Sequence, residues 1–156
     1  MVTRAAVVIL GDQLSHGLAS LKGADPRADV IVMGEPVADI THANHHKKSI
    51  VLVLSAMRRF AESLRAAGWT VDYARLEDKG APETFSDMVA SAVKRRKPKK
   101  IALVEPGDWA VLEEAKSWSD RFGLPVDILE DDRFIASHAE FDAWALGKKA
   151  LRMEFF

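Results

Sequence analysis

Three short polar segments contain the residue types best suited to bind a ligand, and each directly follows an apolar run. They are Gly11-Asp12-Gln13, Gly34-Glu35 and Glu105-Pro106-Gly107-Asp108-Trp109. Glycine lets a ligand approach the backbone closely, carboxylates accept hydrogen bonds, and the glutamine amide both donates and accepts them. No Lys or Arg lies among these residues, so they lack the charge that holds a phosphate. The set favours a neutral ligand that is multiply hydroxylated or heteroaromatic.

The segment at Gly11 has two interpretations. Its position after the first apolar run favours a ligand loop, whereas Gly-Asp is also common in simple turns. The sequence contains neither a Gly-x-Gly-x-x-Gly fingerprint nor the Gly-Lys-Ser/Thr ending of a phosphate-binding loop. The absence of both motifs counts against one hypothesis for the function of this chain, a small nucleotide-binding enzyme.

Three further clusters have weaker links to chemistry. His42 and His46 are four residues apart and, with Asp39, have metal-ligand spacing, but without a second ligand motif a ligand contact or structural hydrogen bond is favoured. The adjacent carboxylates Glu130-Asp131-Asp132 point to different sides of an extended chain, which favours a solvated exit from a strand. Ser15-His16 lacks an oriented acidic partner in the sequence, so hydrolase chemistry is weakly indicated. We expect no catalytic residue and no metal site.

The basic run from Lys94 to Lys100 holds six Lys or Arg residues in seven positions. It fits either a contact with nucleic-acid phosphates or the solvated end of a helix, where cations complement the helix dipole. Aromatic residues are not interleaved, so base stacking is not indicated. The run should lie at the amino end of the strand that follows, opposite the three polar segments.

The composition indicates one globular domain with an ordinary core. The chain has 156 residues, 48% of them apolar, and its 22 basic and 23 acidic residues leave a net charge of −1. The absence of cysteine excludes disulfides, iron–sulfur ligation, thiolate zinc sites and cysteine nucleophiles within this chain. The apolar run from Ala5 to Leu10 is too short for a signal peptide or a membrane span. We expect a soluble, cytoplasmic protein without membrane contact.

Apolar runs that stop at glycine or polar residues predict five strands, and stretches with apolar residues three and four apart predict the helices. The expected strands span residues 5–10, 29–33, 69–75, 101–104 and 125–129. The expected helices span residues 41–67, 84–96, 109–122 and 138–146, and the connection 11–28 is either a loop or contains a short helix near 14–21.

Strands and helices alternate along the chain, which predicts an α/β fold. We expect a Rossmann-like, doubly wound, five-stranded parallel sheet with flanking helices. Ligands in such folds bind outside the carboxyl ends of the strands, where the strand order reverses. Because the three polar segments all follow strands, they should lie at this edge of the sheet.

Several motifs, spread in order over nearly the whole chain, together resemble one family. They are Ile9 to Leu14, His45 to Lys48, Ser55 to Arg58, Leu64 to Trp69, Glu105 to Trp109, Glu130 to Phe134 and Leu151 to Phe156. On these motifs the chain is similar to the prokaryotic photolyase-related proteins, the iron–sulfur bacterial cryptochromes and six-four photolyases.

The resemblance covers only the family's amino-terminal α/β antenna domain. It implies an antenna domain over residues 1–133 and the start of a segment leading to a helical domain over residues 134–156. In the family, that helical domain carries FAD, a four-cysteine 4Fe-4S cluster and the DNA-lesion pocket. We therefore expect a chain that is not catalytic alone. Its partner would be such a carboxyl-terminal FAD domain, and it would meet DNA only through the full-length protein.

In the family, the α/β domain binds 6,7-dimethyl-8-ribityllumazine, an antenna chromophore that passes excitation energy to the flavin. The resemblance implies that the chromophore pocket is formed by Gly11, Asp12, Gln13, Glu35, Asp39, Val53, Glu105, Gly107 and Trp109. Two positions depart from the family pattern: Gly34 stands where a bulkier residue is expected, and Asp39 where a Glu is expected. Either difference would enlarge the pocket or weaken binding.

The main alternative to an antenna domain is a chromophore-free interaction module that docks on the helical domain or on a partner. An exposed apolar patch near Phe134, Phe141, Phe155 and Phe156 would favour docking, because an interdomain face without its partner domain leaves hydrophobic surface exposed that tends to associate. For the same reason we expect weak self-association or disorder after Phe134.

Overall fold

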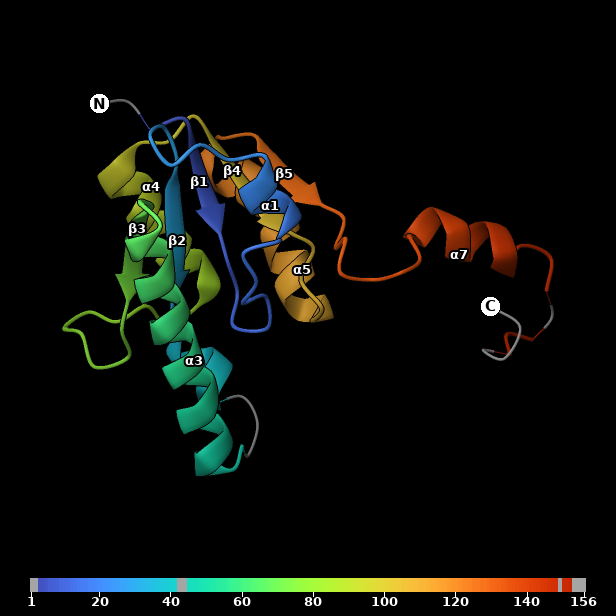
Figure 1. Cartoon of the computed structure of the whole chain (residues 1–156), viewed down its shortest axis with the longest axis horizontal. Coiled ribbons are helices and arrows are strands. Elements are labelled where there is room, and N and C mark those ends of the chain that lie inside the picture. Colours follow the sequence, from blue (N-terminus) through green and yellow to red (C-terminus); the bar gives the residue numbers. More distant parts are fainter. Residues whose placement is uncertain (1–2, 42–44, 149, 153–156) are drawn as a thin grey trace.

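The computed structural model describes residues 3–41, 45–148 and 150–152, and it shows a sheet flanked by helices (Figure 1). The five strands are parallel and lie in the order β3-β2-β1-β4-β5. They are β1 (Ala5–Val8), β2 (Val30–Gly34), β3 (Thr70–Ala74), β4 (Lys100–Val104) and β5 (Val126–Leu129). The predicted Rossmann-like α/β fold is confirmed.

The central strands are buried on both faces, as their continuous apolar composition predicts. Every residue of β1 and β2 is buried, and Val7 of β1 lies opposite Ile31 of β2 and Ala102 of β4. β1 ends two residues before the predicted boundary, although Ile9 N still donates to Val32 O at 3.0 Å. The edge strands β3 and β5 are more exposed.

Two layers of helices cover the sheet. In the described residues the helices are α1 (Ala19–Lys22), α2 (Val37–Thr41), α3 (Lys47–Ala66), α4 (Phe85–Arg96), α5 (Trp109–Lys116), α6 (Trp118–Phe122) and α7 (His138–Ala145). One apolar cluster joins α1 and α3 to the sheet, and a second joins α4, α5 and α6 to its opposite face. The chain therefore forms a three-layer α/β/α arrangement.

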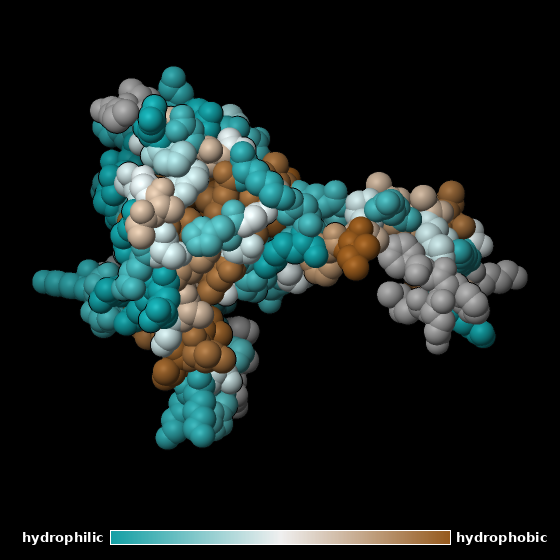
Figure 2. Space-filling model, in the orientation of Figure 1, coloured by the Kyte–Doolittle hydropathy of each residue, from teal (hydrophilic) through white to brown (hydrophobic). Residues whose placement is uncertain are grey.

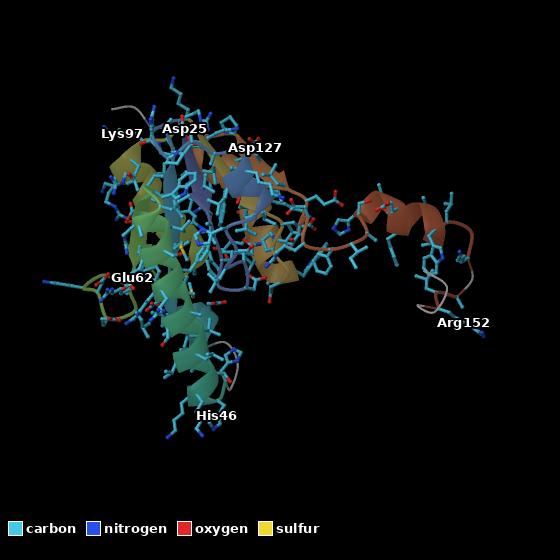
Figure 3. All side chains as sticks on the ribbon, in the orientation of Figure 1. Asp25, His46, Glu62, Lys97, Asp127 and Arg152 are labelled. Carbon is cyan, nitrogen blue, oxygen red and sulfur yellow. The ribbon has the colours of Figure 1, made fainter. Side chains whose placement is uncertain are left out.

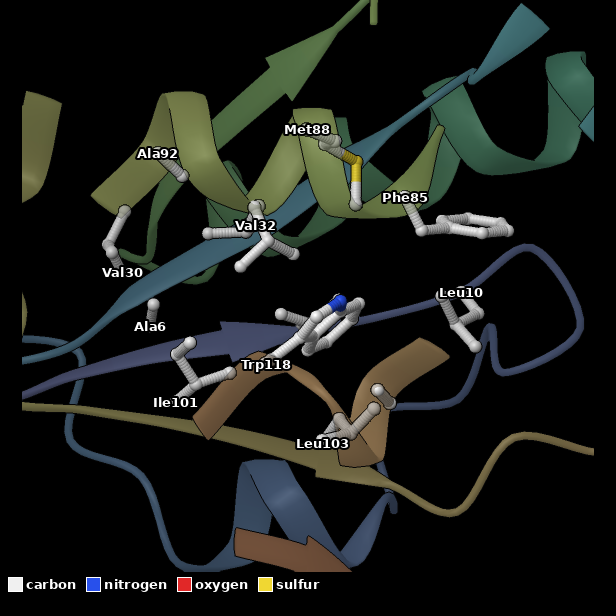
Figure 4. Packing of buried hydrophobic residues seen from close by; sticks show 13 residues of the cluster. Ala6, Leu10, Val30, Val32, Phe85, Met88, Ala92, Ile101, Leu103 and Trp118 are labelled. Carbon is white, nitrogen blue, oxygen red and sulfur yellow. The ribbon is translucent and has the colours of Figure 1, made fainter. Parts of the chain in front are cut away.

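Trp118 anchors the layer formed by α4, α5 and α6. Its side chain is fully buried and belongs to the same cluster as Val32, Ile101 and Leu103 (Figure 4). The indole N–H donates to Ser86 Oγ of α4 at 2.8 Å, so the polar end of this large side chain is satisfied inside the core. The contact ties the first turn of α6 to the first turn of α4.

The helix predicted over residues 41–67 is wrong at its amino end. α3 begins at Lys47 because His46 caps it: the His46 backbone is extended, and its Nδ1 accepts a hydrogen bond from Lys48 N at 3.1 Å. The separate short helix α2 ends at Thr41. A side-chain cap of this kind offers the backbone an alternative to helix, which the apolar spacing alone does not register.

The helix predicted over residues 109–122 is two helices. α5 ends at Lys116, and α6 begins at Trp118. Ser117 lies between them, and its hydroxyl donates to Glu114 O at 2.6 Å. The short helix allowed between the first two strands is α1, which begins later than residue 14.

A capping box stabilises the start of α4. The Thr84 hydroxyl accepts a hydrogen bond from Asp87 N at 3.1 Å, and Asp87 Oδ2 accepts one from Thr84 N at 3.1 Å. Thr84→Ala should lower the free energy of unfolding by about 1 kcal/mol in urea denaturation, because a helix donor loses its partner. Thr84→Ser keeps the hydroxyl and is the control; equal stability of the two variants would contradict the assignment.

The amino-terminal half of α3 projects beyond the sheet, and α7 stands away from it (Figure 1). On the face shown in Figure 2, the projecting half of α3 carries an apolar patch above a hydrophilic tip. Its side chains Val51, Leu52 and Val53 are 64%, 70% and 45% exposed, and these three residues are named the α3 flank. A helix apolar on several sides is normally buried, so the α3 flank is an unusual surface for an isolated domain.

None of the helices in the described part of the chain has the length and apolar character needed to cross a membrane.

The basic run lies at the opposite edge of the sheet from the projecting end of α3. Figure 3 labels Lys97 at one end of the domain and His46 at the other. Arg95 and Arg96 contact Asp72 of β3, with N–O distances of 2.8 and 3.3 Å. These pairs favour a solvated helix end over a nucleic-acid contact as the role of the run.

Candidate functional site

The strand order reverses between β1 and β4, since the chain adds β2 and β3 on one side of β1 and β4 and β5 on the other. The loops that follow β1 and β4 therefore lie next to each other, at the usual ligand position of this fold. Gln13 joins them: its buried Nε2 donates to Val104 O at 3.1 Å and to Glu105 O at 3.2 Å. The Gln13 amide thus holds the two loops together.

Two glycines allow the loops and α3 to approach closely. A Cβ on Gly11 would lie 3.1 Å from Met57 Sδ and 3.5 Å from Val53 Cγ1. A Cβ on Gly107 would lie 3.4 Å from Asp12 Oδ2. The structure therefore brings six of the nine predicted site residues together. This switch-point cluster consists of Gly11, Asp12, Gln13, Val53, Glu105 and Gly107.

Trp109 follows the switch-point cluster at the start of α5. Asp108 caps this helix and accepts hydrogen bonds from Ala110 N at 2.7 Å and Val111 N at 3.3 Å. The Trp109 side chain is 72% exposed, and Lys116 Nζ lies 5.0 Å from the centre of its ring. The Trp109 ring is thus largely exposed, with Lys116 over one of its faces.

Glu35 belongs to a different cluster, between β2, β3 and α3. Its buried carboxylate accepts hydrogen bonds from Arg58 Nε and Nη2, both at 2.7 Å, from Tyr73 OH at 2.6 Å, and from Leu76 N at 2.9 Å. Arg58 also donates to Glu77 at 2.7 Å. The Glu35 carboxylate is thus engaged by protein partners, and it fastens α3 to the loop after β3.

Electrostatics favour the ionised form of Glu35. Burial by itself would raise the pKa of Glu35, but the hydrogen bonds from Arg58, Tyr73 and Leu76 N outweigh it and hold the pKa below its ordinary value. Burial and the bond to Glu35 raise the pKa of Tyr73, so its phenol keeps its proton. The cluster is a stable ion pair with a neutral tyrosine, not a poised acid–base pair.

The space beside Gly34 is occupied by the Ala74 backbone and the Met88 side chain. A Cβ at Gly34 would meet Ala74 O and Met88 Sδ, each at 2.9 Å. A glycine at position 34, where the family pattern has a bulkier residue, therefore opens no room for a ligand at this point. Asp39 is exposed on α2, which is held to the loop after β3 by backbone bonds from Val37 and Ala38.

Two residues of the site were missed in the sequence, Arg133 and His138. Arg133 Nη1 donates to Asp12 O at 2.7 Å, and His138 Nε2 lies 3.1 Å from Glu105 Oε2. The three polar segments themselves contain no Lys or Arg, but the chain beyond β5, which leaves the sheet at the same edge, brings Arg133 to them. The run Glu130 to Arg133 was a usable signal, since β5 ends at that edge too.

The charge of Arg133 is nevertheless paired. Its guanidinium donates to both carboxylate oxygens of Asp131, and these bonds hold the pKa of Asp131 below its ordinary value. Asp132 pairs with Lys22, and Glu130 Oε1 accepts a hydrogen bond from His138 N at 2.8 Å. The acidic run fastens the chain where it leaves β5.

Among the described residues, the histidines do not gather with acidic side chains into a metal-binding group. No group of three or more His, Asp or Glu side chains suited to hold a metal ion occurs in residues 3–41, 45–148 and 150–152. His42 lies outside these described residues. His16 lies 3.1 Å from Ser63 Oγ and packs against Phe60, with ring centres 4.9 Å apart.

Two cavities lie along β3. The smaller, of about 220 Å³, is lined in part by Arg58, Tyr73 and Arg75, and the larger, of about 700 Å³, by Tyr73, Met88 and further residues of the β3–α4 side. None of the nine predicted site residues lines either cavity. The switch-point cluster is therefore distinct from both of these cavities.

The fold and the meeting of the loops at the strand reversal define a Rossmann-like α/β domain. The chain belongs to the deoxyribodipyrimidine photo-lyase-related protein family, whose model matches residues 7–156. It is 45% identical over 150 residues to the (6-4) photolyase of Agrobacterium fabrum (strain C58). That match covers 96% of this chain and 30% of the relative, so the chain spans less than a third of the relative's length.

Proposed function

We propose that this domain binds an antenna chromophore, 6,7-dimethyl-8-ribityllumazine, within a photolyase- or cryptochrome-related protein. The observation that carries the proposal is the composition of the switch-point cluster. It combines two glycines, two carboxylates and an apolar side chain at the ligand position of the fold. The cation that reaches it, Arg133, is already paired with Asp131.

The residues present fit such a ligand by their chemistry. The exposed carboxylate of Asp12 and the partly buried carboxylate of Glu105 suit the hydroxyls of a ribityl chain, which donate hydrogen bonds. Val53 and the exposed ring of Trp109 suit the flat face of a heteroaromatic ring. Gln13 and Glu35 hold the surrounding loops, since protein groups already occupy their polar atoms.

When bound, the lumazine absorbs light and passes the excitation energy to a flavin. The task of this chain is to bind and orient a ligand, which requires no nucleophile or tuned acid–base pair. We place FAD, the 4Fe-4S cluster and the contact with a DNA lesion in further polypeptide of a full-length protein. The relative, named as a (6-4) photolyase, favours DNA repair as the activity of that whole.

Lumazine binding should depend on Val53 more than on its neighbour Val51. Val53 Cγ1 lies beside Gly11 in the switch-point cluster, whereas Val51 belongs only to the exposed α3 flank. Val53→Asp should therefore weaken binding of added 6,7-dimethyl-8-ribityllumazine about tenfold or more, because a carboxylate cannot be desolvated cheaply against the ring. Val51→Asp should bind as the unaltered chain does.

Fluorescence anisotropy of the lumazine, titrated with each purified chain, measures these affinities. Equal affinities of the two variants would place the ligand elsewhere. A lack of binding by the unaltered chain at high micromolar concentrations would overturn the antenna function for this domain.

A chromophore-free docking module is the second candidate, and the exposed α3 flank favours it. Phe134 is also exposed, whereas Phe141 packs against Trp144 with ring centres 5.6 Å apart. Phe155 and Phe156 lie outside the described residues. If docking is the sole function, Val51→Asp and Val53→Asp should both weaken the association with the remainder of a full-length protein, and neither the variants nor the unaltered chain should bind lumazine.

A further inference from the structure

The chain that leaves β5 is bonded to both loops of the switch-point cluster. Arg133 Nη1 donates to Asp12 O in the loop after β1, and His138 Nε2 contacts the Glu105 carboxylate in the loop after β4. Residues 131–138 therefore span the reversal of strand order and are named the post-β5 clamp. Sequence separation makes the contacts notable, since Arg133 and Asp12 are 121 residues apart.

The clamp is itself braced at both ends. Asp131 holds the Arg133 guanidinium through both of its oxygens, which leaves Nη1 directed to the Asp12 carbonyl. A fork of this kind has a defined orientation because guanidinium and carboxylate are both planar. At the other end, His138 N donates to Glu130 Oε1 at 2.8 Å, so the same residue is fixed by its backbone and by its ring.

The loops need such external support. Gly11 and Gly107 have no Cβ, and glycine loses more backbone freedom on ordering than any other residue. Asp12 lies next to Gly11, and its carboxylate is exposed whereas its carbonyl is bound by Arg133. The bond to Arg133 therefore restrains the peptide of Asp12 and leaves the carboxylate free to accept from a ligand.

We propose that Arg133 and His138 are positioning residues, which hold Asp12 and Glu105 in the geometry that receives the ligand. This inference depends on the proposed function in one respect, namely that the ligand is the lumazine. Coupling between two sites is reciprocal, so a ligand that binds the positioned loops also stabilises the clamp. The segment that leaves the domain would thus respond to occupancy of the site.

The first part of the test needs no ligand. It compares the rates of hydrogen–deuterium exchange of backbone amides in the loop after β1, which contains Asp12, between the unaltered chain and Arg133→Gln. The reporters are the amides of Gln13 and Ser15, which bond to Leu10 O at 3.0 Å and Gln13 O at 2.9 Å. Their exchange should rise about tenfold in the variant, because a charged hydrogen bond that restrains the loop is lost. Arg121→Gln is the matched control and should leave both amides unchanged.

The second arm is titration with 6,7-dimethyl-8-ribityllumazine. Arg133→Gln and His138→Ala should each bind the lumazine about tenfold more weakly than the unaltered chain. Arg133→Lys should recover only part of the lost affinity, because lysine lacks the planar guanidinium that bonds Asp131 and Asp12 at once. In the unaltered chain, added lumazine should slow exchange in residues 131–138.

The outcomes separate the two proposals. Unchanged exchange of Gln13 and Ser15 in Arg133→Gln overturns the clamp, whether or not lumazine binds. Faster exchange with unchanged lumazine affinity also overturns the positioning role, since the loop is then loosened without effect on the ligand. Faster exchange together with no lumazine binding by any chain upholds the clamp and overturns the antenna function.

Discussion

Glu35→Gln should lower the free energy of unfolding of this chain by about 2–3 kcal/mol. The carboxylate is fully buried and accepts hydrogen bonds from both sides of the α3–β3 contact, through Arg58, Tyr73 and Leu76 N. Glutamine keeps the shape but removes the negative charge that pairs with the Arg58 guanidinium. The effect stays below that of a fully buried ion pair because the Arg58 side chain is 33% exposed.

The loss should depend on pH in one direction. The pKa of Glu35 lies below the ordinary value of 4.5, so the carboxylate binds protons less readily in the folded chain than in the unfolded one. Its contribution to stability is complete above the unfolded pKa and disappears as the pH falls through the folded pKa. The stability gap between the unaltered chain and Glu35→Gln should therefore be constant near neutral pH and shrink on acidification below about pH 4.5.

Glu77→Gln is the control for this experiment. Glu77 also accepts from Arg58 at 2.7 Å, but its side chain is 55% exposed, so the variant should lose no more than about 0.5 kcal/mol. Urea denaturation at several pH values measures both variants. Equal losses for Glu35→Gln and Glu77→Gln, or a gap that widens in acid, would contradict the structural role of the buried carboxylate.

Gly34→Ala should lower the free energy of unfolding by about 2 kcal/mol, although alanine suits a strand better than glycine does. The added methyl would lie 2.9 Å from Ala74 O, which is backbone and cannot move without disturbing the β2–β3 pairing. Met88 Sδ, also at 2.9 Å, can shift as a flexible side chain. The net loss is the cost of this strain after the entropic benefit of removing a glycine.

Gly17→Ala is the matched control, because a Cβ there would meet only Ser15 Oγ at 3.6 Å. That variant should be within about 0.5 kcal/mol of the unaltered chain in thermal or urea unfolding. A Gly34→Ala variant as stable as Gly17→Ala would show that β3 can move away, and it would reopen the possibility of a larger ligand space beside β2.

The strands and the ligand edge followed from local patterns. Runs such as Ala5 to Leu10 are apolar at every position, and only a strand covered on both faces buries such a run efficiently. Alternation with helices then implies a parallel sheet, whose carboxyl ends share one edge. This is why Gly11, Asp12, Glu105 and Gly107 were expected to meet, and they do.

Helix boundaries were less predictable where a side chain competes for the backbone. The stretch before Ile50 is almost entirely polar, so apolar spacing does not mark where α3 begins; His46 sets that start by accepting a hydrogen bond from Lys48 N. Ser117 separates α5 from α6 in a stretch whose spacing predicts one helix. Such hydrogen bonds depend on a single rotamer, which periodicity does not encode.

The amino-acid sequence by itself determined the α/β class, the family resemblance and the edge of the sheet where the candidate site residues meet. Only the tertiary structure decided what each polar side chain does there. Glu35 meets Arg58 across 23 residues, and Arg133 meets Asp12 across 121. Contacts between residues so far apart in the sequence depend on how the layers of the fold pack together, and no local sequence pattern encodes that packing. For this reason the sequence alone did not predict that Glu35 pairs with Arg58, or that Arg133 contacts the loop of Asp12.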